Sequence, residues 1–152
     1  GVGTFRATYD ASGNVVEQRL PGGVVQSAVF DRAGQEVGLG YQLPGTGGEL
    51  LSWTLGRDAQ GRIVTTSGPS AEGGGRETGY TYDAAERLVG VVDVVDGVCA
   101  QRTYTFDVNG NRTGLASRSD EGDCQAGSSG QGTKAWTYDA ADRVQRGAGG
   151  GG

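Results

Sequence analysis

The fold of this chain is decided by a stretch that reads Tyr80-Thr81-Tyr82-Asp83-Ala84-Ala85-Glu86-Arg87-Leu88-Val89. Its first three residues alternate with a period of two, so that the tyrosines fall on one face of a strand and the threonine on the other. Asp83 then begins a turn, because its carboxylate can accept hydrogen bonds from backbone N–H groups two residues on. The apolar residues after Arg87 predict a second strand. The stretch is therefore a β-hairpin.

The same pattern recurs along the chain. In five copies an aromatic residue precedes the aspartate: Tyr9-Asp10, Phe30-Asp31, Tyr82-Asp83, Phe106-Asp107 and Tyr138-Asp139. A sixth, degenerate copy begins at Asp58, and the six aspartates are 21, 27, 25, 24 and 32 residues apart. Three copies carry another ring two residues before the first, at Tyr80, Tyr104 and Trp136. Near-regular spacing of this kind predicts a repeat protein in which each unit is one hairpin.

Four of the turns carry glycine at their fourth position: Gly13, Gly34, Gly61 and Gly110. Aspartate at the first position and glycine at the fourth suit a type I turn, with the glycine at positive φ forming a bulged hairpin. The other two turns have Glu86 and Asp142 at that position. Because glutamate tolerates left-handed geometry poorly and aspartate only moderately, we expect a different turn type in those two copies.

An isolated hairpin is marginal in water, whereas hairpins stacked edge to edge let each ring cover its neighbour. We therefore predict an all-β fold, an array of antiparallel β-hairpins forming a curled, spiralling sheet that serves as a shell or tube wall. The repeats are expected over residues 1–146. Residues 147–152 are expected to be a Gly-rich flexible tail or linker.

Composition narrows the function. The 152 residues include no histidine, which removes the commonest general base and metal ligand, so we expect no catalytic site, no metal and no cofactor. A net charge of −5 argues against nucleic acid as a partner. The longest apolar run, near Val91, is interrupted by Asp93 and Asp96, so no membrane span is expected. The absence of methionine suggests that Gly1 begins a fragment or processed product, and the excess of arginine over lysine suggests a GC-rich source.

The motif [Tyr/Phe]-Asp-x-x-Gly-[Asn/Arg], preceded by an aromatic-Thr pair, resembles the YD repeat of RHS-repeat proteins. The resemblance spans about Thr4 to Gln145 and is clearest around Asp83, Asp107 and Asp139. It implies a spiralling β-sheet that winds into a hollow shell. In bacterial members the shell often encloses a C-terminal toxin, and in animal relatives it is an adhesion scaffold. The chain lacks the Asp-Pro pair linked to self-cleavage in toxin shells, so the resemblance implies shell wall.

Two cysteines, Cys99 and Cys124, flank one hairpin and lie outside the repeat motif. Two cysteines without histidine are too few for a closed zinc site. We interpret them as a disulfide that clips the insertion Gly114–Thr133, worth about 3.5 kcal/mol in the chain-entropy model. A disulfide implies an oxidising compartment, and hence a secreted, extracellular or cell-surface protein. Two unrelated buried thiols are the alternative.

Three other interpretations were weighed. The segment from Asp107 to Asn111 resembles the start of a calcium loop but lacks its later glycine and glutamate, so calcium is rejected. The glycine runs lack the lysine and the strand-to-helix context of a phosphate-binding loop. A sugar-stacking platform could be built from aromatic side chains, namely Trp53, Tyr80, Tyr104 and Trp136, although packing inside the array is favoured for them.

The sequence therefore predicts a structural repeat segment of a large secreted or surface protein, and not an enzyme. Its partners would be the rest of its own parent chain, or neighbouring copies joined through open sheet edges. An enclosed toxin is a further partner implied by the resemblance. The alternatives are an adhesion module that binds glycan or a surface protein, and a subunit of a self-assembling extracellular filament.

Overall fold

The computed structural model describes residues 4–45, 48–70, 73–121 and 131–150. These residues form β-strands and turns, and the chain divides into two compact units, residues 1–75 and 76–152. The strands of the first unit are β1 (Arg6–Tyr9), β2 (Val15–Arg19), β3 (Val25–Phe30), β4 (Glu36–Gln42), β5 (Glu49–Arg57) and β6 (Ile63–Pro69). Those of the second are β7 (Gly75–Tyr82), β8 (Leu88–Val95), β9 (Val98–Phe106), β10 (Arg112–Glu121), β11 (Gln131–Tyr138) and β12 (Val144–Gly150).

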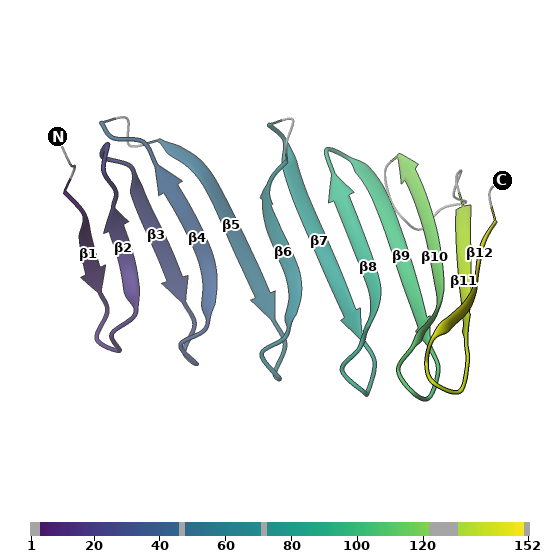
Figure 1. Ribbon diagram of the computed structural model, residues 1–152. Helices are drawn as coiled ribbons and strands as arrows, with labels where there is room; N and C mark the ends of the chain where they lie inside the picture. Colours follow the sequence, from purple (N-terminus) through teal and green to yellow (C-terminus); the bar gives the residue numbers. More distant parts are fainter. Residues whose placement is uncertain (1–3, 46–47, 71–72, 122–130, 151–152) are drawn as a thin grey trace. The chain divides into compact units, whose positions relative to one another are not determined.

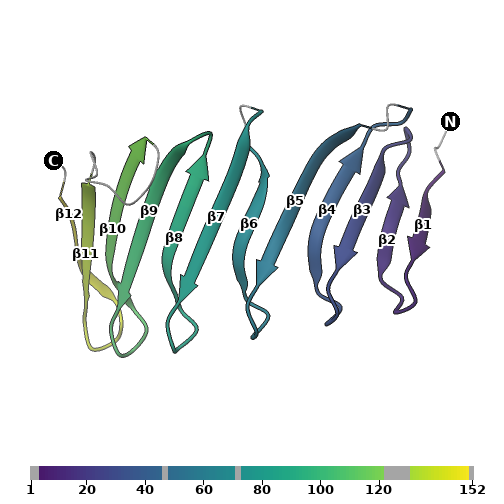
Figure 2. The ribbon, with the colours of Figure 1, turned by 180° about the vertical axis from the view of Figure 1, so that it is seen from behind.

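Within each unit the strands pair in the order of the sequence, and every pairing is antiparallel (Figure 1). The view from behind shows the same succession of hairpins without a crossover inside either unit (Figure 2). Short hairpin connections join antiparallel strands directly, as expected where no helix links them. The predicted all-β array of antiparallel hairpins is confirmed.

Alternation along the strands places rings and threonines on opposite faces. In β7, Tyr80 and Tyr82 are half-buried whereas Thr81 between them is exposed. The same contrast separates Tyr104 and Phe106 from Thr105 in β9, and Trp136 and Tyr138 from Thr137 in β11. The period of two read from the sequence is thus the period of the sheet.

A β-bulge accompanies each of the six repeated turns. In all six hairpins the bulge lies at the same place, because the pairing skips one residue in the strand after the turn. The skipped residues are Val16, Val37, Val64, Val89, Thr113 and Gln145. A bulge adds one residue to one strand and increases the local twist. The repeated turn therefore sets both the register and the twist of its hairpin.

The expectation of a different turn type at Glu86 and Asp142 was wrong. Glu86 has a φ of 63° and Asp142 a φ of 57°, in the left-handed region where Gly110 also lies at 88°. Their backbone N–H groups donate to the carbonyl of the turn aspartate, as the glycines do. The hydrogen bonds of the turn thus impose the geometry on residues that do not favour it.

Two expected loops contain strand. β12 continues to Gly150, so that residues 147–150, predicted to be a flexible tail, pair with β11. Within the predicted insertion Gly114–Thr133, β10 extends to Glu121 and β11 starts at Gln131. Strand pairing is made by backbone groups, so residues without bulky side chains can join the ladder beside a well-formed strand.

Two turns at the opposite ends of the strands had no predicted role. Asp96 and Gly97 form a two-residue turn between β8 and β9, with φ values of 51° and 85° as a type I′ turn requires. The Asp-Gly pair between runs of valine was the signal for it. The turn that begins at Ser70 has the hydrogen bonds of the aspartate turns, with the Ser70 hydroxyl oxygen in place of the carboxylate. This oxygen accepts from the Gly74 N–H at 3.0 Å.

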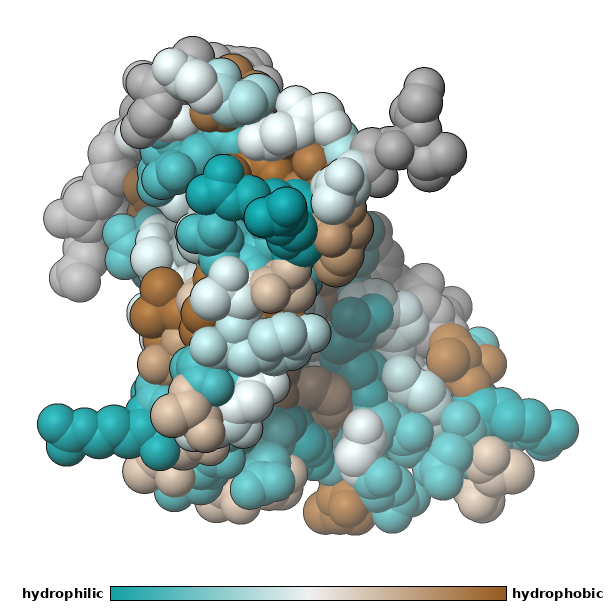
Figure 3. All heavy atoms as spheres, turned by 90° about the vertical axis from the view of Figure 1, so that its left-hand side faces the viewer, coloured by the Kyte–Doolittle hydropathy of each residue, from teal (hydrophilic) through white to brown (hydrophobic). Residues whose placement is uncertain are grey.

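Little of either unit is fully buried. Among the described residues, Val91 and Cys99 are the hydrophobic side chains that reach full burial, while Phe5, Tyr9 and Val29 are more than half exposed. In Figure 3 hydrophobic residues are scattered among hydrophilic ones on the surface in view. Each unit is a single layer of hairpins, so turns and contacts between neighbouring strands must supply what a two-layer core normally supplies.

We predict that Glu86→Gly stabilises the chain by roughly 1 kcal/mol, because glycine adopts the left-handed backbone without the steric cost that glutamate bears. The matched reverse change, Gly110→Ala, should destabilise it by about the same amount. Urea unfolding followed by circular dichroism measures both. Equal stability of Glu86→Gly and the unsubstituted chain would show that this turn is not strained.

Candidate functional site

The repeated aspartates lie in one row of turns in each unit. Asp10, Asp31 and Asp58 begin the β1–β2, β3–β4 and β5–β6 turns, and Asp83, Asp107 and Asp139 begin the β7–β8, β9–β10 and β11–β12 turns. Within each unit these turns lie along the same edge of the sheet, at the bottom of Figure 1. This row recurs with the same geometry in every repeated turn of the described residues, and it is the candidate site of function.

One carboxylate oxygen closes every turn. Oδ1 of each aspartate accepts hydrogen bonds from the backbone N–H groups two and four residues on, at 2.8 to 3.0 Å. The backbone adds two more bonds, since the aspartate N–H donates to the carbonyl four residues on and its own carbonyl accepts from the residue three on. Four hydrogen bonds therefore fix each turn.

The second carboxylate oxygen explains why the motif continues with asparagine or arginine. Oδ2 accepts from Nε of Arg62, Arg87 and Arg143 at 2.7 to 2.8 Å. In two other turns it accepts from Nδ2 of Asn14 at 2.9 Å and Asn111 at 3.1 Å. Both side-chain types present a planar N–H donor to the carboxylate. The sequence displayed this preference but not its cause.

These hydrogen bonds lower the pKa of five turn carboxylates, namely Asp10, Asp58, Asp83, Asp107 and Asp139. The backbone N–H of the residue four positions on is the main cause that lowers the pKa of Asp83 and Asp139, and the Asn14 side chain is the main cause at Asp10. Partial burial raises the pKa of Asp58 and Asp107. Hydrogen bonds from the residue four on outweigh that effect, so the pKa of both still lies below the ordinary value of 3.8.

Arginine side chains connect each hairpin of the second unit to the next. The Arg87 guanidinium lies 4.9 Å from the centre of the Phe106 ring and donates to the Asp107 carbonyl at 3.1 Å. Arg112 lies 4.6 Å from the Trp136 ring centre, and its carbonyl accepts from the Tyr138 hydroxyl at 2.9 Å. Cation–π contacts and hydrogen bonds thus join rings that are separated in the sequence.

A polar bridge supplements these contacts between two turns. Asn109 and Asn111 both donate from Nδ2 to Oδ1 of Asp142, at 3.1 and 2.7 Å. Asp142 is one of the residues forced into left-handed geometry. Its carboxylate therefore provides a contact between hairpins that glycine at the same position could not make.

Three of the four rings proposed as a sugar-stacking platform, Trp53, Tyr104 and Trp136, contact other side chains, and the fourth, Tyr80, is half-buried. Trp53 in β5 meets Tyr41 of β4 edge to face, with ring centres 6.0 Å apart, and covers Gly68 of β6, where any Cβ would collide with the indole. Tyr104 and Trp136 lie on either side of Arg112. Tyr9 differs, with 60% of its surface exposed.

A buried charged cluster in the second unit was missed by the sequence reading, which treated Asp93 only as a break in an apolar run. Asp93 is 7% exposed and accepts from the Thr78 hydroxyl at 2.6 Å and from Arg76 Nη2 at 2.8 Å. Arg102 pairs with its other carboxylate oxygen. Burial raises the pKa of Asp93, but these partners outweigh it and hold the pKa below 3.8. The cluster links β7, β8 and β9.

The structure describes one of the two cysteines, Cys99. Cys99 lies in β9 and is 1% exposed. Cys124 lies outside the described residues, so the disulfide between them stays a prediction. Within the described ranges no cluster of three or more His, Cys, Asp or Glu side chains is placed to hold a metal ion, and no helix is long and apolar enough to cross a membrane.

We predict that Asp83→Asn lowers stability at neutral pH and that its effect shrinks in acid. A carboxylate whose folded pKa lies below its unfolded value stabilises the fold above the unfolded pKa, near 3.8, and loses that contribution as pH falls through the folded pKa. Urea unfolding at a series of pH values measures the difference between variant and parent. Glu77→Gln, which removes an exposed carboxylate from β7, is the matched control. A pH-independent difference would contradict the assignment.

We predict that Asp93→Asn destabilises the chain by about 2 kcal/mol, because a neutral amide replaces the buried carboxylate that pairs with Arg76 and Arg102. Arg102→Gln should cost less, and Arg76→Gln least, since their side chains are 41% and 53% exposed. Chemical denaturation ranks the three variants. A cost for Arg76→Gln as large as that for Asp93→Asn would refute the proposed order.

Comparison with known proteins identifies the fold. No family model matches the chain, and no curated protein matches it. A crystal structure of TcdB2-TccC3-Cdc42 matches 92% of this chain with a TM-score of 0.72 and 16% identity. A crystal structure of TcdB2-TccC3 matches 92% with a TM-score of 0.66 and 23% identity. The chain spans only 8% and 7% of the respective matched chains. It therefore has the fold of a segment of these TcdB2-TccC3 structures, as its resemblance to YD and RHS repeats predicts.

Proposed function

We propose that this chain is a structural segment of a large secreted or cell-surface protein, forming part of a β-shell or stalk that encloses or displays another domain. The row of aspartate turns carries the proposal. The same carboxylate hydrogen bonds close each turn, and each time the result is a hairpin of fixed register. A regular series of hairpins is a building element for an extended wall.

The shallow burial of both units supports a role inside a larger body. Sheets that stand alone normally cover at least one face with a second layer, yet fully buried side chains are few among the described residues. The matched structures are chains more than ten times longer than the matched segment, to judge from the 7–8% coverage. Additional chain could cover what these units expose.

The state of the carboxylates favours structure over catalysis. A general acid or base must be free to exchange a proton with substrate. The six turn aspartates instead accept backbone hydrogen bonds, and the pKa of five of them is lowered. These five are therefore held as charged turn-formers at neutral pH. We accordingly propose a non-enzymatic role for this segment.

The proposed location rests on the predicted disulfide between Cys99 and Cys124. Disulfides persist in oxidising compartments, which for this chain means outside the cell or at its surface. The enclosed domain is proposed to be a toxin, because that is what the resemblance to bacterial RHS proteins implies. The rest of the parent chain is then the main partner of the segment.

Limited proteolysis of the parent protein tests the proposal. If the segment is shell wall, the domain that follows it should resist trypsin while the wall is intact. Asp83→Ala and Asp139→Ala remove turn carboxylates and should accelerate cleavage of that domain severalfold. Val108→Ala is the control, because Val108 lies in the β9–β10 turn with its side chain wholly exposed. Its cleavage rate should match that of the unsubstituted protein.

Two outcomes would contradict the shell proposal. Equal cleavage rates in all variants would show that the wall protects nothing. Glycan binding that disappears in Trp53→Ala or Trp136→Ala while the fold persists would instead favour an adhesion module.

A further inference from the structure

We propose that the outer edge of β1 is a docking site for a β-strand that places a carboxylate opposite Arg6 and an arginine over Tyr9, and that Arg6 keeps a second copy of this chain away from the same edge. Among the described residues β1 pairs with β2 alone, so its other edge presents unpaired backbone groups. The inference rests on the structural role proposed above and deepens it, because it specifies which strand can continue the sheet beside β1.

The four junctions between hairpins that the structure describes share one register. In each junction the residue seven positions after one turn aspartate lies opposite the residue four positions before the next turn aspartate. These pairs are Glu17 and Ser27, Gly38 and Thr54, Gly90 and Thr103, and Gly114 and Ala135. Arg6 lies four positions before Asp10. A strand that joins β1 in this register therefore places the seventh residue after its own turn aspartate opposite Arg6.

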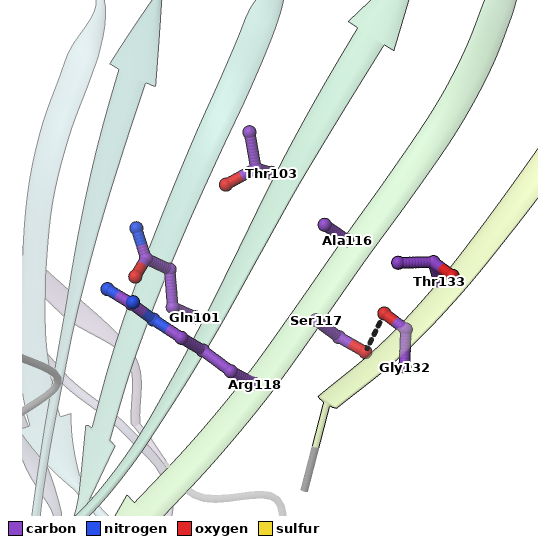
Figure 4. A pocket seen from close by; sticks show the side chains of 7 residues that line it. All are labelled: Gln101, Thr103, Ala116, Ser117, Arg118, Gly132 and Thr133. Atoms are coloured by element: carbon purple, nitrogen blue, oxygen red, sulfur yellow. Dashed lines mark hydrogen bonds between the residues drawn. The ribbon is translucent and has the colours of Figure 1, made fainter. Parts of the chain in front are cut away.

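Arg6 differs from the residues at the same place in the other hairpins. There the position four before the aspartate and its partner across the hairpin are both uncharged. These pairs are Ser27 and Gly40, Thr54 and Ser67, Gly79 and Val92, Thr103 and Ala116, and Ala135 and Ala148. Figure 4 shows the pair Thr103 and Ala116, whose short side chains line a hollow on the face of the sheet. In the first hairpin both positions are arginine, since Arg6 lies opposite Arg19.

The charge of Arg6 has no counterpart within the described residues. Like charges directly opposite each other destabilise a pair of strands. Arg19 binds Glu17, with Nε and Oε1 3.2 Å apart, whereas Arg6 is exposed and forms no ion pair among the residues that the structure describes. An acidic residue on an incoming strand would neutralise Arg6, and an arginine there would add a third like charge. Arg6 therefore selects the charge of the strand that pairs with β1.

Tyr9 lacks the contact that covers the corresponding ring in the second unit. Of the five rings that directly precede a turn aspartate, four are half-buried and Tyr9 is exposed over 60% of its surface. Arg87 lies four residues after its own turn aspartate, contacts the Phe106 ring of the next hairpin and donates to the Asp107 carbonyl at 3.1 Å. An arginine at the same place in the incoming strand would cover Tyr9 and donate to the Asp10 carbonyl.

The β12 end of this chain meets one of these two conditions and fails the other. Arg143 lies four residues after Asp139, and its side chain is 78% exposed. The seventh residue after Asp139 is Arg146. A second copy that approached β1 with its β12 would therefore bring an arginine to Tyr9 but would place Arg146 opposite Arg6. This charge mismatch predicts that the unsubstituted chain associates end to end only weakly.

A charge-exchange series in the whole 152-residue chain tests the site, with self-association measured by sedimentation equilibrium and folding checked by circular dichroism. Arg146→Glu turns β12 into the strand that the site should accept, and Arg6→Glu reverses the charge of the site. Each should tighten association about tenfold relative to the unsubstituted chain. The double variant restores like charges and should associate as weakly as the unsubstituted chain. Arg118→Glu, the matched control, makes the same change at an exposed position of β10 and should leave association unchanged.

Two further variants and a change of salt separate the contacts. Arg6→Ala removes the repulsion but offers Arg146 no opposite charge, so it should associate more weakly than Arg6→Glu. In the Arg146→Glu background, Tyr9→Ala removes the ring that Arg143 would contact and should weaken association severalfold. Sodium chloride at about 1 M, where the Debye length is about 3 Å, should weaken association of Arg146→Glu, because attraction between exposed charges is screened.

Equal association of the unsubstituted chain and Arg146→Glu would overturn the proposal, and so would a double variant that associates as tightly as the single ones. Equal association of Arg6→Ala and Arg6→Glu would also overturn it, because Arg6 would then only block the edge and select no acidic strand. These measurements use this chain alone, whereas the shell proposal is tested by cleavage of the domain that follows, so failure of one is distinguishable from failure of the other.

Discussion

The hydrogen bonds from two backbone N–H groups to one carboxylate oxygen are the constraint on which the rest of this structure depends. In a two-layer protein the apolar face of a strand fixes its register, because a slip of one residue would turn that face to water. The single-layer units of this chain bury few side chains completely, so that penalty is weak. In these units the turn fixes the register of the strands instead. Once Asp83 has bound the N–H groups of Ala85 and Arg87, the strands on either side can pair in one register only, and a bulge follows.

Contacts between successive hairpins extend this local order. In the second unit the Arg87 guanidinium contacts the Phe106 ring and the Asp107 carbonyl. The Arg112 guanidinium lies between the Tyr104 and Trp136 rings, and so connects the next two hairpins. Each contact joins a hairpin to its next neighbour, which is the arrangement expected of a quasi-one-dimensional array. The stability of such an array is a sum over units and their junctions, so the loss of one turn carboxylate weakens a single hairpin and the two junctions beside it.

The sequence predicted the features that depend on local spacing. The alternation of rings with threonine, and the aspartate four residues before an asparagine or arginine, specify a hairpin without knowledge of any distant contact. Features that depend on pairing between distant residues were not predictable in this way. Asp93 meets Arg76 and Arg102 only because three strands align in a particular register. Propensity also failed at Glu86, where four hydrogen bonds outweigh the cost of a left-handed backbone.

The two faces and the turn edge of the second unit have different roles, and this difference follows from the geometry of a pleated sheet. One face carries the rings and arginines that connect hairpins, and one edge carries the turns that set their register. The opposite face is needed for neither purpose, so its residues can vary in size and charge without breaking the array.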